Sequence, residues 1–377
     1  MQDDQRLPPG RVPGAPDPAF WAGRRVVVTG HTGFKGSWLA LWLEALKANV
    51  TGYALAPPTE PSLFRLARAH ASMNSVLGDV RDLEHVCRVV AAARPEVLIH
   101  MAAQSVVRTG YSDPVETYAT NVMGTVNVLE ALRRSGLACA VVNVTTDKCY
   151  APRSHGPGYR ENEPMGGHDP YSNSKGCSEL VTSAYRDSFF NPVSFSKHGV
   201  ALGSARAGNV IGGGDWTAHQ LIPDLLRAFA QAEPCRIRSP NSIRPWQFVL
   251  EPLRGYLLLA ERLSSGAASF ASGWNFGPVD EDARPVSWIA DRLARAWGDS
   301  AAWVVDGAEH PHEDEVLRLD ASRAGRELGW RPAMPLGDAL DWIVEWTRRW
   351  RAGEDARTVT RAQIVNYSAR LVQTAGS

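Results

Sequence analysis

The segment VVVTGHTGFKGSW, residues 26–38, places three glycines between an apolar strand and a helix. Gly30, Gly33 and Gly36 follow the strand directly and open the helix. Glycine allows a tight turn and a close approach of the backbone to a pyrophosphate, and a helix N-terminus adds free N–H groups and a positive dipole end. We therefore predict a nucleotide-binding turn at the start of the fold.

Strands and helices alternate on both sides of this turn. The predicted strands cover residues 25–29, 50–55, 75–77, 97–101, 138–145 and 200–208, and the predicted helices 35–47, 84–93, 117–134, 171–190, 222–230 and 252–263. Strands separated by helices of this length pair in parallel, with helices on both faces. The pattern predicts an α/β fold, a Rossmann-type doubly wound parallel sheet with a smaller C-terminal α/β domain, and ligands at the carboxyl ends of the strands.

Composition excludes several functional classes. The 377 residues contain 40 basic and 40 acidic side chains, so no net field draws the chain to nucleic acid or to a membrane surface. No run of eighteen apolar residues is present, and the first twenty residues lack the apolar stretch of a signal peptide. The five cysteines are scattered without a CxxC pair, which predicts a reduced, cytoplasmic enzyme without disulfides or a metal site.

Two polar motifs stand out, one at the end of a predicted strand and one at the start of a predicted helix. In VTTDKCY, residues 144–150, Asp147 and Lys148 stand at a strand end, where an incidental ion pair in a solvated loop is the alternative reading. In YSNSK, Tyr171 and Lys175 are four residues apart and share a helix face. A phenol titrates near pH 10, and an ammonium one turn away, with the positive charge of an oxidised nicotinamide, favours the phenolate and lowers its pKa. The second motif therefore predicts a general base.

With TGxxGxxG and YxxxK together, the chain resembles the extended short-chain dehydrogenase/reductase family of nucleotide-sugar enzymes. The segments GHTGFKGSWL, TTDKCY, MGGHDPYSNSKG, ARAGNVIGGGDW and RPWQFVLEPLRGYLLLAERL narrow the likeness to its 4,6-dehydratases. The resemblance implies NAD as cofactor and CDP-glucose or a related nucleotide sugar as substrate. The stretches 102–111 and 151–160 depart from the family pattern, which leaves the details of substrate contact open.

The resemblance also implies catalytic roles. Thr146, Tyr171 and Lys175 would oxidise the sugar at C4; Lys148 would then remove the C5 proton, and Asp147 would protonate the leaving C6 hydroxyl. Lys148 would need a pKa lowered by roughly three units and Asp147 a raised one, and burial favours both. A plain exposed ion pair would shift both in the wrong direction, so we expect the two side chains to diverge or to share a proton.

The binding residues form two sets. The predicted cofactor contacts are Gly30, Thr32, Gly33, Phe34, Lys35, Gly36, Asp79, Val80, Ala102, Ala103, Gln104, Asn121, Thr145, Tyr171 and Lys175. The predicted substrate contacts are Gln104, Ser105, Arg108, Asn209, Arg238, Arg244, Gln247, His312 and Glu313. Asp79 could instead cap the next helix, and each arginine could be an ordinary surface residue. No acidic residue ends the second strand, so the residues alone barely separate NAD from NADP.

The residue pattern predicts the domains, and the resemblance implies the assembly. Residues 1–20 would be a flexible tail, 21–195 an NAD-binding domain joined by strands near 200–210 and 272–277, 211–352 mainly a substrate domain, and 353–377 a C-terminal extension. A homodimer or dimer of dimers would pair through helices 117–134 and 171–190. The alternatives are a 4-epimerase or C4 oxidoreductase, a dehydratase of another nucleotide hexose, and a non-catalytic cofactor sensor on the same fold.

Overall fold

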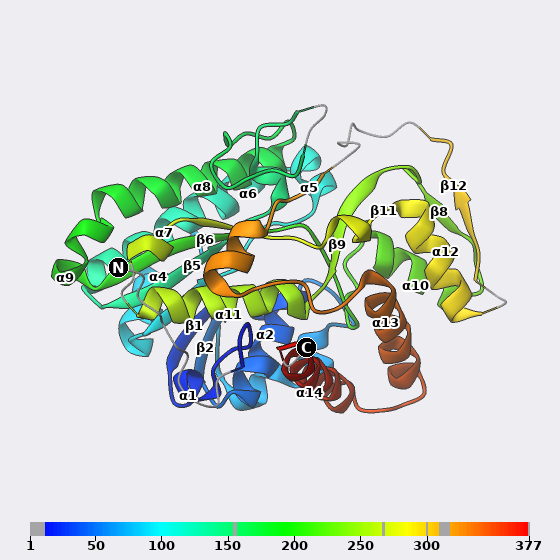
Figure 1. Ribbon diagram of the computed structural model, residues 1–377, viewed down its shortest axis with the longest axis horizontal. Coiled ribbons are helices and arrows are strands. Elements are labelled where there is room, and N and C mark those ends of the chain that lie inside the picture. Colours follow the sequence, from blue (N-terminus) through cyan, green and yellow to red (C-terminus); the bar gives the residue numbers. More distant parts are fainter. Residues whose placement is uncertain (1–11, 154–156, 266–267, 299–300, 309–316, 376–377) are drawn as a thin grey trace.

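The computed structural model describes residues 12–153, 157–265, 268–298, 301–308 and 317–375. Its centre is a seven-stranded sheet in the order β10-β6-β5-β4-β1-β2-β3, in which every pairing is parallel. The strands are β1 (Arg25–Thr29), β2 (Asn49–Ala54), β3 (Asn74–Leu77), β4 (Val97–His100), β5 (Cys139–Val144), β6 (Val200–Ala207) and β10 (Gly273–Phe276). The predicted doubly wound parallel sheet is confirmed (Figure 1).

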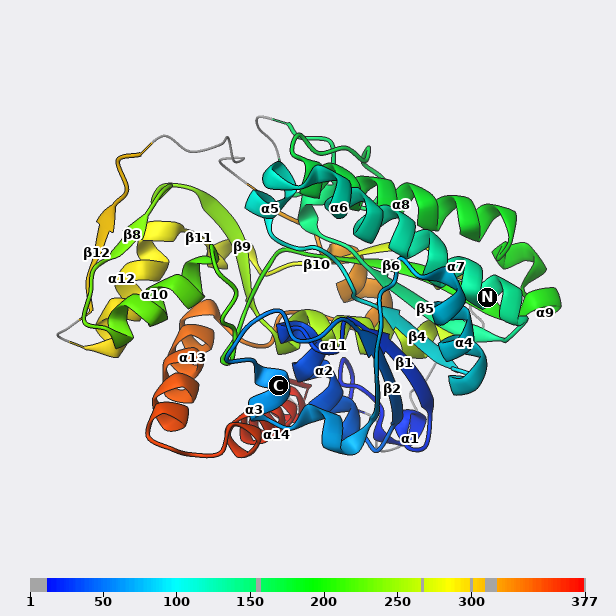
Figure 2. The ribbon, with the colours of Figure 1, turned by 180° about the vertical axis from the view of Figure 1, so that it is seen from behind.

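Alternate residues of the central strands enter two separate cores. Val27, Leu98 and Val141 pack with the helices of one face, whereas Val26 and Ile99 join the larger core on the other. This alternation follows from the two-residue period of a strand, and burial on both faces explains why the central strands β1, β4 and β5 are largely apolar. The helices of the first face are α4 (Leu83–Ala93), α7 (Gly124–Ser135) and α8 (Pro170–Ser188), and those of the second are α2 (Phe34–Ala45) and α11 (Leu250–Ser264) (Figures 1 and 2).

One predicted helix is interrupted. The segment expected as a single helix over 117–134 consists of α6 (Pro114–Tyr118), a π-helical turn η2 (Ala119–Met123) and α7. A π turn inserts one extra residue into the helix and is frequent at functional sites. This one contains Asn121, a predicted cofactor contact.

A smaller set of elements lies beside the large sheet (Figure 1). Its three-stranded sheet has the order β11-β9-β7, and a two-stranded sheet pairs β12 with β8. These strands are β7 (Asn209–Ile211), β8 (Cys235–Ile237), β9 (Ile243–Phe248), β11 (Ala283–Pro285) and β12 (Trp303–Val305), and the helices are α10 (Leu221–Ala230), α12 (Val286–Trp297) and α13 (Leu336–Arg351). The shorter helices elsewhere are α1 (Pro18–Trp21), α3 (Leu63–Leu66), α5 (Val107–Ser112) and α9 (Phe195–His198).

The end of the chain returns to the large sheet. Helix α14 (Ala356–Ala375) packs against α2, where the rings of Trp42 and Tyr367 lie 5.8 Å apart edge to face and Arg357 pairs with Glu44. The predicted C-terminal extension is therefore a helix in contact with the cofactor half of the fold, and the domain boundaries themselves stay predictions. Within the described ranges, no helix combines the length and apolarity that crossing a membrane requires.

Candidate active site

The turn between β1 and α2 is shaped by close backbone contacts. Gly30 has a φ of +77°, and a Cβ there would lie 2.8 Å from the backbone nitrogen of Ala102. A Cβ on Gly36 would lie 2.1 Å from the carbonyl oxygen of Gly30. Gly33, the N-cap of α2, is different, because a Cβ there would lie 3.5 Å from its nearest non-adjacent neighbour, the carbonyl oxygen of Gly30. Two glycines thus pack the turn, and the third leaves space at the helix N-terminus, as a bound pyrophosphate requires.

Two side chains of the turn reach the neighbouring strands. Thr32 donates to the carbonyl oxygen of Leu55 (2.8 Å), just beyond the end of β2. His31 is buried and shares a 2.7 Å hydrogen bond with Ser75 of β3. Burial lowers the pKa of His31 to about 4, so the ring is neutral at pH 7. The turn therefore offers a cofactor mainly its backbone.

Asp79 lies beyond the end of β3, where an adenine contact is predicted. Its carboxylate accepts hydrogen bonds from the backbone nitrogen and the guanidinium of Arg81, and these bonds lower its pKa. The helix that follows is capped by Asp82, which accepts from His85, so the interpretation of Asp79 as the helix cap is wrong. Its adjacent residue Val80 is buried, and the contact of both with the cofactor stays a prediction.

The loop after β4 is held by the π turn. The side-chain oxygen of Asn121 accepts a hydrogen bond from the backbone nitrogen of Gln104 (2.9 Å). The side-chain nitrogen of Asn121 donates to the carbonyl oxygen of Gln104 and to the hydroxyl of Ser174 on α8. The side-chain amide nitrogen of Gln104 donates to Thr117, and its oxygen accepts from Val106. Gln104 therefore shapes the loop with both ends of its amide. The other predicted contacts of this loop are Ala102, Ala103 and Ser105, with Arg108 following in α5.

Helix α8 lies along the carboxyl end of β5, and its start is well determined by sequence. Asp169 is the N-cap and accepts from the backbone of Ser172, while Pro170 occupies the first helical position. Tyr171 and Lys175 then fall one turn apart on the buried side. The helix thereby delivers a phenol and an amine to the edge of the sheet where ligands bind.

Three successive turns of α8 contact the three residues 144–146 at the end of β5. The amine of Lys175 donates to the carbonyl oxygen of Val144 (3.2 Å). The hydroxyl of Thr145 donates to Glu179, and Thr146 hydrogen-bonds the Tyr171 hydroxyl. The structure therefore brings together the predicted residues Thr146, Tyr171 and Lys175.

Asp147 and Lys148 form a short 3₁₀ turn, η3 (Asp147–Cys149), capped by Thr146. Asp147 is 2% exposed; one oxygen accepts from the Thr146 hydroxyl (2.9 Å), and the other has no hydrogen-bond partner among the described residues. Lys148 is half-buried, and within the described ranges these two residues form no ion pair with each other. The alternative of an exposed incidental pair does not match this geometry. A buried carboxyl oxygen without a partner is suited to contact a substrate.

The charges of the site are strongly affected by burial. Burial raises the pKa of Tyr171, and hydrogen bonding with the Thr146 hydroxyl acts to lower it. Burial lowers the pKa of Lys175 to about 8, and the neighbouring Lys35 lowers it as well, whereas Glu179 acts in the other direction. Burial also lowers the pKa of Lys35 to about 8 against the attraction of Asp147. Both lysines are thus near their titration point at neutral to mildly alkaline pH.

Lys35 occupies a more central position than its predicted role as a cofactor contact. The charge of Asp147 acts to raise the pKa of Lys35, and Lys35 in turn lowers the pKa of Lys175. The amine of Lys35 is 5.8 Å from the ring centre of Tyr256 on α11. The chain has 35 arginines and five lysines, and three of those lysines are Lys35, Lys148 and Lys175. Amines that can release a proton are therefore concentrated at this site, since arginine stays charged.

The predicted substrate contacts lie in the smaller set of strands. Asn209 is in β7, directly paired with β9, which carries Arg244 and Gln247. Arg244 is 5% exposed, and the amide nitrogen of Gln247 donates to the carbonyl oxygen of Phe276 while its oxygen has no partner among the described residues. A surface role for Arg244 does not match its burial. Arg238 follows β8, and His312 and Glu313 lie outside the described residues.

Sequence reasoning missed two buried residues beside the site. Glu179 follows Lys175 by one further helical turn, and Arg206 lies at the end of β6, opposite it. They form an ion pair of 2.8 Å in which both side chains are nearly inaccessible. The spacing Tyr171, Lys175, Glu179 continues the pattern of one helix face, and that signal was present in the sequence.

Known proteins resemble this chain in sequence and in fold over most of its length. The family model described as GDP-mannose 4,6 dehydratase matches residues 27–341. The CDP-glucose 4,6-dehydratase of Salmonella typhimurium is 55% identical over 351 residues, which cover 93% of this chain and 98% of that protein. The dTDP-glucose 4,6-dehydratase of Streptomyces griseus is 28% identical, with 87% and 95% covered. The predicted resemblance to the dehydratases is confirmed.

Solved structures agree on the fold. The dTDP-glucose 4,6-dehydratase DesIV of Streptomyces venezuelae, solved with NAD bound, has a TM-score of 0.71 at 25% identity and covers 88% of this chain and 99% of its own. An epimerase of Methanothermobacter thermautotrophicus reaches 0.74 at 22% identity, with 89% and 95% covered. Dehydratases and epimerases thus share this architecture, and the fold alone does not separate them.

Proposed function

Because this chain belongs to the GDP-mannose 4,6 dehydratase family, we propose that it is an NAD-dependent hydro-lyase that converts CDP-D-glucose to CDP-4-keto-6-deoxy-D-glucose. The observation that supports this most strongly is 55% identity, over nearly the whole chain, to a CDP-glucose 4,6-dehydratase. An epimerase or a simple C4 oxidoreductase would need Tyr171 and Lys175 but no acid and base next to Thr146. The buried Asp147 beside Lys148 favours the dehydratase over both.

The cofactor fits the turn between β1 and α2. Gly30 and Gly36 are closed to any side chain, while Gly33 leaves room at the N-terminus of α2 for a diphosphate. Thr32, Phe34 and Lys35 border it in sequence, and the loops carrying Asp79, Val80, Ala102, Ala103 and Gln104 follow β3 and β4 along the same sheet edge. When bound, NAD accepts a hydride from C4 of the sugar and later returns it to C6.

Oxidation at C4 needs a base for the O4 proton. We assign this role to Tyr171, with Thr146 orienting O4 through its hydroxyl and Lys175 stabilising the phenolate by its positive charge. Burial works against the phenolate, as the raised pKa of Tyr171 indicates, so the nearby cations must compensate for it. The oxidation leaves a ketone at C4, which acidifies the proton at C5.

Elimination then removes water across C5 and C6. Lys148 takes the C5 proton, and Asp147 gives a proton to the departing C6 hydroxyl. As the hydride arrives at C6, the protonated Lys148 returns a proton to C5, and transfer of the O4 proton from Tyr171 to Asp147 restores both groups. The atoms balance as CDP-glucose in, 4-keto-6-deoxy product and water out. The Asp147 oxygen that has no hydrogen-bond partner in the described part of the chain is the one we assign to this proton transfer.

The nucleotide end of the substrate is assigned to the smaller sheets. Arg244 and Arg238 would bind the diphosphate, with Asn209 and Gln247 beside them and Ser105 and Arg108 on the sugar side. Residues 211–352 would then form most of a substrate domain, and 21–195 an NAD domain. The side chains of Val115, Met123 and Leu180 on α6, η2 and α8 are apolar and exposed, which supports a homodimer through these helices. The enzyme would be cytoplasmic.

One experiment tests the proposal and its alternatives. The purified protein is incubated with NAD and, separately, CDP-, dTDP-, UDP- and GDP-glucose, and the products are identified by NMR. A 4-keto-6-deoxy sugar from CDP-glucose is the expected result. Formation of a C4 epimer would identify an epimerase, product from another nucleotide alone would change the substrate, and no turnover of any of the four would contradict the proposal.

A further inference from the structure

Glu179 is the centre of a buried hydrogen-bond network behind the candidate active site. One carboxylate oxygen accepts from the Thr145 hydroxyl and from Nε of Arg206 (2.9 Å), and the other accepts from Ser204 (2.7 Å) and from a terminal nitrogen of Arg206 (2.8 Å). The side chain of Glu179 is 5% exposed. A carboxylate with four donors is satisfied as an anion, because a protonated carboxyl would lose acceptor capacity.

The network ties Glu179 to several segments that reach the site. The second terminal nitrogen of Arg206 donates to the hydroxyl of Tyr150 (2.8 Å), which in turn donates to Asn275 of β10 (2.6 Å). Tyr150 follows η3 directly, and its ring stacks on Tyr159 with centres 4.8 Å apart. Glu179 therefore connects the residues before and after Asp147 and Lys148, through Thr145 on one side and Arg206 with Tyr150 on the other.

We propose that Glu179 is a positioning residue of the candidate site: held as an anion by Arg206, it fixes the end of β5 through Thr145 and stabilises the ammonium of Lys175. The proposal rests on the proposed function for the roles of Thr146, Tyr171 and Lys175. Glu179 touches none of the reacting atoms. It acts through the strand end that carries Thr146 and through the charge of the lysine one turn before it.

The electrostatics agree with this geometry. Burial acts to raise the pKa of Glu179, but the charge and hydrogen bonds of Arg206, with those of Thr145 and Ser204, hold it below its usual range. The groups that act on Lys175 are Lys35 from α2, Cys149 from η3 and Glu179 from its own helix, and His100 of β4 is affected by Lys175 in turn. Glu179 is the carboxylate in this set that opposes the loss of the Lys175 proton.

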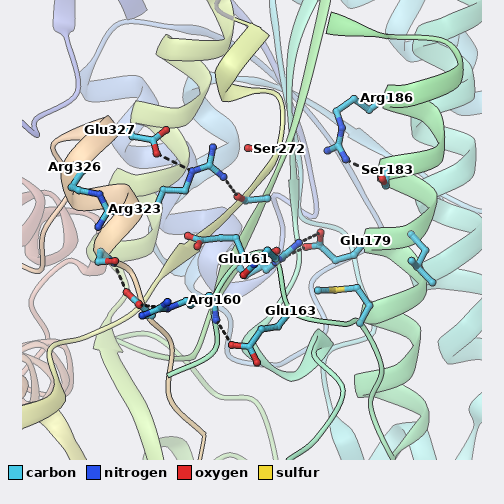
Figure 3. A pocket seen from close by; sticks show the side chains of 17 residues that line it. Arg160, Glu161, Glu163, Glu179, Ser183, Arg186, Ser272, Arg323, Arg326 and Glu327 are labelled. Atoms are coloured by element: carbon cyan, nitrogen blue, oxygen red, sulfur yellow. Dashed lines mark hydrogen bonds and ion pairs between the residues drawn. The ribbon is translucent and has the colours of Figure 1, made fainter. Parts of the chain in front are cut away.

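The pair also borders a cavity distinct from the candidate active site. Glu179 and Arg206 line a cavity of about 710 Å³ together with Glu161, Arg186 and Arg323 (Figure 3). The described residues lining it do not include Thr146, Tyr171 or Lys175. The Glu179–Arg206 pair therefore contacts this charged cavity and, through Thr145, the strand end that carries Thr146.

The first test measures Lys175 without cofactor or substrate. With only five lysines in the chain, ¹³Cε-lysine labelling gives a simple NMR spectrum in which Lys175→Arg assigns the signal. In Glu179→Gln the Lys175 signal titrates at lower pH than in the parent, because the neutral amide no longer favours the ammonium, and Glu179→Asp restores part of the difference. An unchanged titration in Glu179→Gln overturns the electrostatic role.

The control is a second buried pair of the same kind. Glu251 and Arg254 lie 3.1 Å apart on α11, where Glu251 accepts from the backbone of Ala333 and Met334 instead of from the site. Glu251→Gln should lower thermal stability without moving the Lys175 titration. A shift of equal size in this variant would mean that loss of any buried pair changes the signal, and it would overturn the proposal.

The second test isolates the contact with β5 and remains available if Glu179→Gln does not fold. Thr145→Val keeps the shape of the side chain and removes its hydrogen bond to Glu179. The expected result is a kcat for C4 oxidation reduced about tenfold or more, with KM for the nucleotide sugar little changed, since a small misplacement at a catalytic strand end can cost up to about 100-fold. Full kcat overturns the positioning role. Absence of activity in the parent would contradict the proposed function instead, while the NMR result would stand.

Discussion

Helices α2 and α8 both lie at the carboxyl ends of the strands of the large sheet, but α2 contributes backbone atoms to the site and α8 contributes side chains. At α2 the important groups are backbone atoms, since Gly30 and Gly36 admit no Cβ and Gly33 keeps the helix N-terminus open. At α8 they are side chains, with Tyr171, Lys175 and Glu179 on successive turns. Addition of an atom should therefore damage the first region, whereas the second should be damaged by removal or neutralisation of a group.

The largest effect is expected at the phenol of α8. Tyr171→Phe removes the base for the O4 proton, and general acid–base catalysis of this kind contributes about 10²- to 10⁴-fold to a rate. Turnover of CDP-glucose should fall by that factor, as measured by the formation of the 4-keto sugar. Tyr185→Phe on the same helix is the matched control, because its hydroxyl contacts Glu130 at 3.4 Å, far along the helix from Tyr171. Full activity of Tyr171→Phe would remove Tyr171 from the mechanism.

The next effect distinguishes oxidation from elimination. Asp147→Asn and Lys148→Ala should slow the loss of water by about 10²-fold or more while leaving the C4 oxidation intact. Reduced cofactor would then accumulate after mixing with substrate and be detected by its absorbance. Lys197→Ala, at an exposed lysine of α9, should behave like the parent. If both site variants kept full turnover, the assignment of acid and base would be wrong.

The contrast between the two helices also explains what the sequence could predict. The glycine turn and the YxxxK pair are local patterns with fixed spacing, so the fold around β1, α2 and α8 followed from them. Glu179 belongs to the same helix face, yet its partners Thr145, Ser204 and Arg206 come from distant segments. Because the hydrogen-bond donors to Glu179 come from segments distant in sequence, the only local sign of its role is its helical spacing from Lys175.

Two other features depended on tertiary context. The π turn at 119–123 keeps the composition of an ordinary helix, so its wider backbone hydrogen bonding leaves no mark in the sequence. The two hydrogen bonds between Asn121 and the Gln104 backbone join segments that are seventeen residues apart. Lys35 at the start of α2 comes within electrostatic range of Asp147 after β5, because both lie at the carboxyl ends of the parallel strands, although more than a hundred residues separate them in the sequence. Spacing along the chain does not report such proximity.

A pair of glycine variants tests the α2 side of the comparison. Gly36→Ala places a Cβ 2.1 Å from the carbonyl oxygen of Gly30, and overpacking of this kind costs about 1–3 kcal/mol or more, so thermal unfolding should move to lower temperature. Gly33→Ala should leave thermal stability near that of the parent and weaken NAD binding about tenfold or more, as measured by calorimetry. Gly307→Ala, with no atom within 4 Å of the new Cβ, should change neither quantity. Equal NAD affinity in Gly33→Ala and the parent would contradict the placement of the diphosphate at α2.

The smallest effect concerns pH and the α8 side. The productive form has a phenolate at Tyr171 and an ammonium at Lys175, which is one proton fewer than the fully protonated pair. Burial raises the pKa of Tyr171 and lowers the pKa of Lys175 to about 8, so the first of the pair's two protons is lost near pH 8. The remaining proton can lie on either residue, and in the productive form it lies on Lys175. The single-turnover rate of C4 oxidation should therefore rise as the pH increases toward about 8 and then level off, by up to about tenfold per unit below that point. A rate that is constant between about pH 6.5 and pH 8.5 would show that the pair keeps a fixed protonation state, and that α8 contributes shape to the site without proton transfer.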